Sequence, residues 1–229
     1  MMFPYLDPTI VLLIPAMLFY LWSQFKVKSA FSRYSEVRAA SGVTADQVSR
    51  ALLDRFGLEN VRVERIQGHL TDHYDPRSKV LRPSDAVSGN SSIAAIGVAA
   101  HEVGHAIQDK DGYAFLRLRN SIVPAVNIGS TISMPLFFIG LIMGSAPLLN
   151  IGILLFCGVL VFHLVTLPVE FDASARALRL LSETGLLKGS EVGGAKAVLD
   201  AAALTYVAAL VMTVLQLVRL LALRGMRRD

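Results

Sequence analysis

The sequence predicts a mainly α-helical membrane protein with a small α+β part outside the lipid. Of its 229 residues, 53% are hydrophobic and only 17% are charged, whereas soluble domains carry about 25% charged residues. No Asp, Glu, Lys or Arg occurs from Asn120 to Val169, which is room for two spans of about 20 residues each. A third observation is the sequence His-Glu-Val-Gly-His at 101–105, within a segment of helical character.

Residues 1–25 are predicted to form an N-terminal transmembrane span. No charged residue occurs from Pro8 to Phe25. Basic residues follow this apolar run, among them Lys26, Lys28 and Arg33, whereas a cleavable signal would have them in front. The positive-inside rule then predicts an external N-terminus and a cytoplasmic continuation.

Residues 26–119 are predicted to be the cytoplasmic catalytic part. Thr44 and Gln47 have the spacing of a capping box and predict an amphipathic helix over 45–56. Residues 61–66 alternate with a period of two, which is typical of a strand.

Residues 69–81 are predicted to form two further strands. The turn between them is expected at 75–78, where the sequence reads Asp-Pro-Arg-Ser. A helix is expected from Ser92 to Asp109, with Asn90 or Ser91 as its N-cap.

The two histidines of this helix are predicted zinc ligands. Positions i and i+4 lie on one face of a helix, so His101 and His105 are able to bind one Zn²⁺. A hydrolytic zinc site needs a third protein ligand, and Glu170 supplies it in a helix predicted to begin at Pro168. Glu102 is the predicted general base, which takes a proton from zinc-activated water and passes it to the leaving amine.

The apolar stretch 120–169 is predicted to be a transmembrane hairpin. Its spans are expected at 121–144 and 149–167, separated by Gly-Ser-Ala-Pro at 144–147. A hairpin returns the chain to the side it left, so both predicted histidine ligands and Glu170 share one face of the membrane.

The last part of the chain is predicted to hold a helix with loop, 170–200, and an apolar helix with a basic tail, 201–229. The stretch 201–218 is long enough for a span. Arginines follow it, among them Arg224, Arg227 and Arg228. A full span would place them outside, against the positive-inside rule, so a helix lying against the catalytic part is the alternative.

Together, these features resemble the YugP-like bacterial neutral zinc metallopeptidases. The resemblance rests on the His-Glu-x-x-His helix, the hairpin, Pro-Val-Glu-Phe-Asp-Ala-Ser at 168–174 and Gly-His-Leu-Thr-Asp-His-Tyr-Asp-Pro at 68–76. It implies a zincin-like catalytic part with a gluzincin site. The chain is more distantly similar to HtpX-type membrane proteases and CAAX prenyl-protein endoproteases, in which an Asp braces a zinc-binding His. Here that position is Ser174, so no carboxylate brace is expected there.

Residues 70–74 are the candidate substrate strand, because in gluzincins a strand beside the zinc helix binds the peptide at the sheet edge. The candidate substrate-binding residues are Leu70, Thr71, His73 and Tyr74. His69 and His73 are four residues apart, but on a strand this spacing forms no common face, so a structural or substrate role is favoured over metal binding.

Three further polar residues have alternative interpretations. Tyr206 is a candidate oxyanion donor, although tyrosines are common at membrane interfaces. His163 lies within an apolar span, where a hydrogen bond inside the bundle is favoured over a functional role. Asp172 points away from Glu170 on a helix and is expected at the surface or as a brace.

The sequence thus predicts a multi-pass bacterial membrane protein that hydrolyses peptide bonds with Zn²⁺ at the cytoplasmic face. Its expected partners are peptide or membrane-protein substrates and membrane lipid. No basic cluster with interleaved aromatics occurs, so no nucleic-acid partner is expected. The alternatives are a non-catalytic scaffold with a structural zinc, which Glu102 argues against, and a zinc amidase on non-peptide substrates. The only cysteine, Cys157, excludes an intrachain disulfide.

Overall fold

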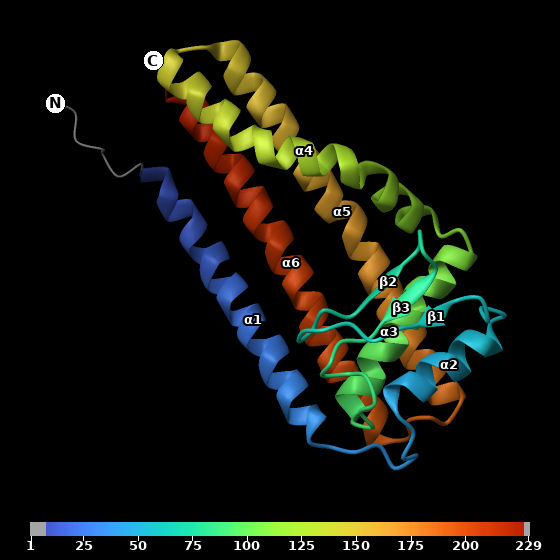
Figure 1. Cartoon of the computed structure of the whole chain (residues 1–229). Coiled ribbons are helices and arrows are strands. Elements are labelled where there is room, and N and C mark those ends of the chain that lie inside the picture. Colours follow the sequence, from blue (N-terminus) through green and yellow to red (C-terminus); the bar gives the residue numbers. More distant parts are fainter. Residues whose placement is uncertain (1–7, 227–229) are drawn as a thin grey trace. The chain divides into compact units, whose positions relative to one another are not determined.

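The computed structural model describes residues 8–226, so the predictions for 1–7 and 227–229, including Arg227 and Arg228, lie outside the described residues. The chain is mainly helical, with one small sheet (Figure 1). The elements in chain order are a 3-10 helix Pro8–Leu13, α1 Ile14–Ser35, α2 Ala45–Arg55, β1 Arg62–Val63, β2 His73–Asp75, β3 Val80–Arg82, α3 Ile93–Lys110, α4 Ala114–Met143, α5 Ala146–Glu183 and α6 Ser190–Gly225.

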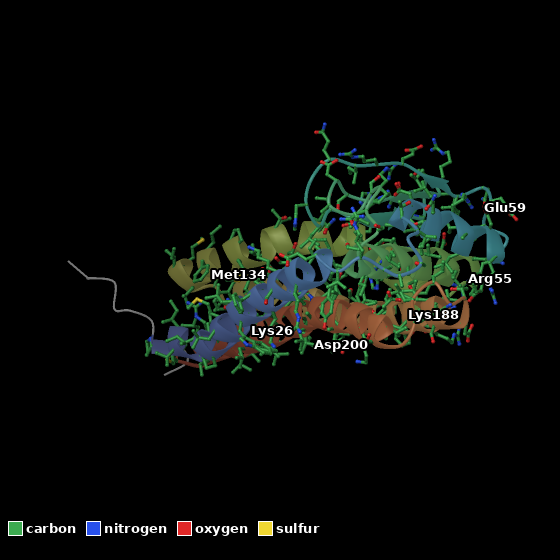
Figure 2. All side chains as sticks on the ribbon, turned by 90° about the horizontal axis from the view of Figure 1, so that it is seen from below. Lys26, Arg55, Glu59, Met134, Lys188 and Asp200 are labelled. Atoms are coloured by element: carbon green, nitrogen blue, oxygen red, sulfur yellow. The ribbon has the colours of Figure 1, made fainter. Side chains whose placement is uncertain are left out.

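The chain divides into two compact units. The apolar unit comprises Met1–Gln24, Leu118–Leu167 and Thr205–Asp229, and the site unit comprises Phe25–Arg117 and Pro168–Leu204. The charged side chains labelled in Figure 2 all belong to the site unit, whereas the labelled Met134 belongs to the apolar unit.

Within residues 8–226, four helical segments are long and apolar enough to cross a membrane. They are Pro8–Ser35, Ala114–Met143, Ala146–Glu183 and Ser190–Gly225. Residues 205–225 of α6 group with the apolar unit. This grouping favours a fourth span over a helix that lies against the catalytic part.

The predicted helical hairpin is present as α4 and α5, which meet at a tight turn. Gly144 has a φ of 74° there, a conformation that glycine adopts without steric cost. The two helices pack closely: a Cβ at Gly140 would lie 2.8 Å from Leu148 Cβ, and one at Gly152 would lie 2.9 Å from Phe137 Cβ.

The prediction that a new helix begins at Pro168 is wrong. Helix α5 runs unbroken from Ala146 to Glu183, with Pro168 inside it. Proline removes one backbone hydrogen bond from a helix interior, but apolar helices of membrane proteins tolerate this loss because neighbouring groups satisfy the freed carbonyl. Glu170 therefore lies on the same continuous helix as the second predicted span.

The predicted loop before the last helix is shorter than expected, because α6 already begins at Ser190. The first turns of α6 contain two glycines, Gly193 and Gly194, which have a low helix propensity. Gly194 instead allows a close approach, since a Cβ there would lie 2.8 Å from Tyr34 Cε1. Tertiary packing thus outweighs the low helix propensity of glycine.

The site unit contains a three-stranded sheet with the order β1-β3-β2. Strand β3 pairs in parallel with β1 and antiparallel with β2. The turn between β2 and β3 is where it was predicted, and the Ser78 hydroxyl and the Arg77 N–H donate to the Asp75 carboxylate there. These bonds hold the pKa of Asp75 at about 2.

The strands are shorter than the sequence predicted. The stretch 61–66 forms a strand only at Arg62–Val63, and the candidate substrate strand 70–74 begins only at His73. Leu70 adopts a φ of 57°, which is incompatible with an extended strand. Leu70 and Thr71 therefore lie in the loop before β2.

Helices α2 and α3 begin at side-chain caps. Thr44 and Gln47 form the predicted capping box of α2. Helix α3 is capped by Ser92, whose hydroxyl accepts from the Ala95 N–H at 3.2 Å, and not by Asn90 or Ser91. Asn90 instead accepts a hydrogen bond from the Ser92 N–H, so it orients the cap rather than being the cap.

Candidate metal centre

Helix α3 and the part of α5 that belongs to the site unit bring the predicted metal ligands together. The ligand atoms of His101, His105 and Glu170 all lie within 4.8 Å of one another. Glu170 Oε2 lies 3.3 Å from His101 Nε2 and 3.7 Å from His105 Nε2. Glu170 and His105 are buried, and His101 is half-buried.

This arrangement fits a zinc ion. Two imidazole nitrogens and one carboxylate oxygen are a donor set of hydrolytic zinc sites. Atoms about 2.1 Å from a tetrahedral zinc lie about 3.4 Å from each other, and the two distances from Glu170 Oε2 to the histidine Nε2 atoms, 3.3 and 3.7 Å, bracket that value.

The centre depends on a close contact between α3 and α5 at Gly104. A Cβ built there would lie 2.7 Å from the Ala173 carbonyl oxygen and 3.1 Å from Ala173 Cα. These are backbone atoms, which are unable to move aside without moving the helix. Gly104 therefore lets the histidines of α3 approach Glu170 on α5.

Replacing Gly104 with Ala is expected to force the two helices apart. Such overpacking costs typically 1–3 kcal/mol, of which the better helix propensity of Ala recovers about 1 kcal/mol. We expect a lower zinc content and a lower unfolding temperature in detergent. Gly193→Ala is the matched control, because a Cβ at Gly193 meets no atom within 4 Å. Equal zinc content in both variants would show that the close contact is not required.

Glu102 follows His101 directly on α3 and is only 7% exposed. Within residues 8–226 its carboxylate makes no hydrogen bond or ion pair with the protein. A buried carboxylate without a partner is costly, so this acid is available to a water or a substrate.

Each predicted histidine ligand has a second polar neighbour at its Nδ1 atom. Ser174 Oγ lies 3.1 Å from His101 Nδ1, and Gln108 Oε1 lies 3.0 Å from His105 Nδ1. As expected from the sequence, Ser174 supplies no carboxylate, but its hydroxyl contacts His101 at the position where a carboxylate brace would lie. Gln108 was not identified from the sequence, although its position three residues after His105 on a helix is a usable signal.

Asp172 braces the candidate metal centre indirectly, through Gln108. Its Oδ2 accepts hydrogen bonds from Gln108 Nε2 at 2.8 Å and from Arg176 Nε at 2.7 Å. Arg176 also donates to Asp111 Oδ2 at 2.7 Å. Of the two expectations for Asp172, surface or brace, the structure supports the brace.

Strand β2 forms one edge of the small sheet and contacts α3. Tyr74, in the middle of β2, donates its hydroxyl to Asp109 Oδ2 at 2.7 Å. Burial and this hydrogen bond raise the pKa of Tyr74. The Tyr74 side chain therefore anchors β2 to α3, which leaves the backbone of the strand edge as the candidate peptide contact.

The other candidate residues are not part of the metal cluster. His73 contacts the Thr71 carbonyl oxygen through Nδ1 and Arg82 through Nε2, and His69 packs its ring on Phe31. Tyr206 and His163 belong to the apolar unit, and their roles stay predictions.

Comparison with known proteins agrees with this chemistry. The family model described as "Putative neutral zinc metallopeptidase" matches residues 9–225. The chain is 48% identical over 198 residues to "Putative membrane protease YugP" of Bacillus subtilis (strain 168), which covers 86% of this chain and 88% of that protein. No solved structure matches the chain.

Proposed function

The chain belongs to the neutral zinc metallopeptidase family, and on that premise we propose that it is a gluzincin-type membrane endopeptidase. His101, His105 and Glu170 would hold one Zn²⁺, and Glu102 would be the general base. The observation that carries the proposal is the convergence of three zinc-type ligand atoms within 4.8 Å, beside an acid that has no partner within residues 8–226.

The residues of the chain divide the work of hydrolysis. A zinc ion at this site supplies Lewis-acid chemistry, which acidifies water and polarises a carbonyl group. Glu102 takes the proton of the attacking water and delivers it to the leaving amine. Ser174 and Gln108 hold the two imidazoles in orientation. The edge of β2 is the proposed place where an extended peptide adds its backbone.

Two rival functions are less well supported. A non-catalytic scaffold with a structural zinc has no use for Glu102, since structural zinc sites generally close the fourth coordination position with a further protein ligand. A zinc amidase on lipid or cell-wall material would use the same chemistry. The name of the Bacillus subtilis relative, a membrane protease, favours peptide substrates.

Zinc-dependent cleavage by the purified full-length protein tests the proposal. In detergent, a mixture of peptides is expected to gain new N-termini, because peptide hydrolysis releases an amine. A chelator should stop the reaction, and added Zn²⁺ should restore it. Release of amine from non-peptide amides without new peptide N-termini would favour the amidase, and a zinc-loaded but inert protein would favour the scaffold.

We further propose a multi-pass bacterial cell-membrane protein whose site faces the cytoplasm. In this arrangement residues 26–119 and 170–200 lie inside. Basic residues next to the proposed spans support it, since they are concentrated in the site unit: Lys26, Lys28, Arg33, Lys110, Arg117, Arg176, Arg179, Lys188 and Lys196. Fewer basic residues, Arg219 and Arg224 among those described, follow the last apolar stretch.

Single cysteines test this topology after the native Cys157 has been replaced by Ala. A membrane-impermeant thiol reagent applied to intact cells is expected to label Ser145→Cys at the α4–α5 turn. It should label Ser78→Cys and Lys188→Cys only after the membrane is permeabilised. Labelling of Ser78→Cys and Ser145→Cys from the same side would contradict the proposed hairpin topology.

A further inference from the structure

Gln108 is a fully buried polar side chain behind the candidate metal centre. Its amide has three contacts: Oε1 with His105 Nδ1 at 3.0 Å, and Nε2 with the Val169 carbonyl oxygen and Asp172 Oδ2, both at 2.8 Å. A buried amide group must find a partner for each polar atom. These neighbours therefore decide which way the amide faces.

The orientation of the Gln108 amide follows from the chemistry of two neighbours. A backbone carbonyl oxygen is able only to accept, and so is the Asp172 carboxylate, which is ion-paired with Arg176. The NH₂ group must face both of them. A flipped amide would place its carbonyl oxygen against two other oxygens, with the loss of two hydrogen bonds in a buried place.

Because the NH₂ group faces Val169 and Asp172, the Gln108 carbonyl oxygen must face His105 Nδ1. An oxygen acceptor at 3.0 Å requires a proton on that nitrogen. A neutral imidazole carries only one N–H, so Nε2 keeps its lone pair. This is the nitrogen that faces Glu170 Oε2, at 3.7 Å.

We infer that Gln108, oriented by Val169 and Asp172, is a positioning residue that holds His105 as the Nδ1–H tautomer, in which Nε2 carries the lone pair that would bind the metal. The inference rests on the proposed metal site. Ser174 does not fix the tautomer of His101 in this way, because a hydroxyl is able either to donate or to accept a hydrogen bond. The two histidines therefore differ, and the tautomer of His105 is the one that its surroundings dictate.

Arg176 extends this arrangement across the two helices. It holds Asp172 on its own helix α5 and Asp111 at the end of α3. The hydrogen bonds from His105 through Gln108 and Asp172 to Arg176 are thus anchored on both helices. Substitutions that keep the volume of these side chains but change donors and acceptors should therefore alter the metal site.

The zinc dissociation constant of the full-length protein in detergent, measured by competition with a chromophoric chelator, tests the inference. Gln108→Met keeps the volume but removes the acceptor, and we expect affinity to fall by about 10- to 100-fold. Ile107→Met is the matched control, because Ile107 is a buried neighbour that takes no part in the hydrogen bonds from His105 to Arg176. The zinc affinity of this variant should equal that of the wild type. Equal affinity in Gln108→Met and Ile107→Met would overturn the inference.

A swap of donor and acceptor separates this role from simple packing. Gln108→Glu places a third acceptor against Val169 and Asp172 and should weaken zinc binding. Adding Asp172→Asn provides a donor to Glu at position 108 and should recover about tenfold in affinity, with the net charge of the wild type. A role in packing alone predicts no such recovery, so a double variant no tighter than Gln108→Glu would overturn the inference, as would a Gln108→Glu variant as tight as the wild type.

The swap still decides the matter if Gln108→Met does not fold. Failure of the inference about Gln108 is also distinguishable from failure of the proposed function. A wild-type protein that binds no zinc would refute the metal site itself. A wild-type protein that binds zinc with an affinity that does not depend on Gln108 would refute only the inference about Gln108.

Discussion

Glu102→Gln is expected to retain the fold and the zinc content of the wild type but to lose peptide hydrolysis. The amide has nearly the shape of the carboxylate but is unable to take a proton from water. General acid–base catalysis typically contributes 10²- to 10⁴-fold, so we expect kcat to fall by about that factor. Because Glu102 has no protein partner within residues 8–226, the substitution should disturb no internal hydrogen bond.

Cleavage rates and zinc content measured on the same purified samples provide the test. Glu59→Gln, at an exposed glutamate of the site unit, is the matched control and should cleave like the wild type. Undiminished hydrolysis by Glu102→Gln would rule out Glu102 as the base. A proteomic comparison of membranes that contain the wild type or Glu102→Gln would also identify the physiological substrates.

Glu170→Ala is expected to lose most of the bound zinc. With this change, two imidazoles remain where three protein ligands are needed, and the buried negative charge that would balance the cation disappears. Substitution of a residue that only hydrogen-bonds to a metal ligand typically lowers metal affinity by 10- to 100-fold. Loss of a ligand itself should therefore lower the affinity by more than about 100-fold. Zinc analysis after dialysis against a weak chelator measures the effect.

Glu183→Ala is the control for this experiment, because Glu183 lies on the same helix α5 with a side chain that is 54% exposed. It should retain zinc at the wild-type level. Full zinc content in Glu170→Ala would overturn the assignment and would direct attention to Asp172 or His73. A zinc-free variant with an unchanged unfolding profile would show that Glu170 serves the metal rather than the fold.

The long-range proximity of His101, His105 and Glu170 was predictable from local patterns in the sequence. The spacing of the two histidines is a property of any helix. An uncharged stretch of two span lengths predicts a hairpin, and a hairpin returns Glu170 to the side of the histidines. The capping box at Thr44 and the turn after Asp75 were predictable for the same reason, since both depend only on residues within one turn of chain.

Only the tertiary structure decided which groups support those ligands. Gln108 meets Val169 and Asp172 because α3 and α5 approach closely at Gly104, and no local pattern reports the contact between two helices. The same contact places the Ser174 hydroxyl beside His101. The continuity of α5 through Pro168 and the short β2 also differ from what the local preferences of proline and of alternating residues predict, because tertiary context is able to override such preferences. The histidine spacing and the uncharged hairpin were enough to predict the candidate ligands, whereas the hydrogen bonds that orient them depend on how the helices cross.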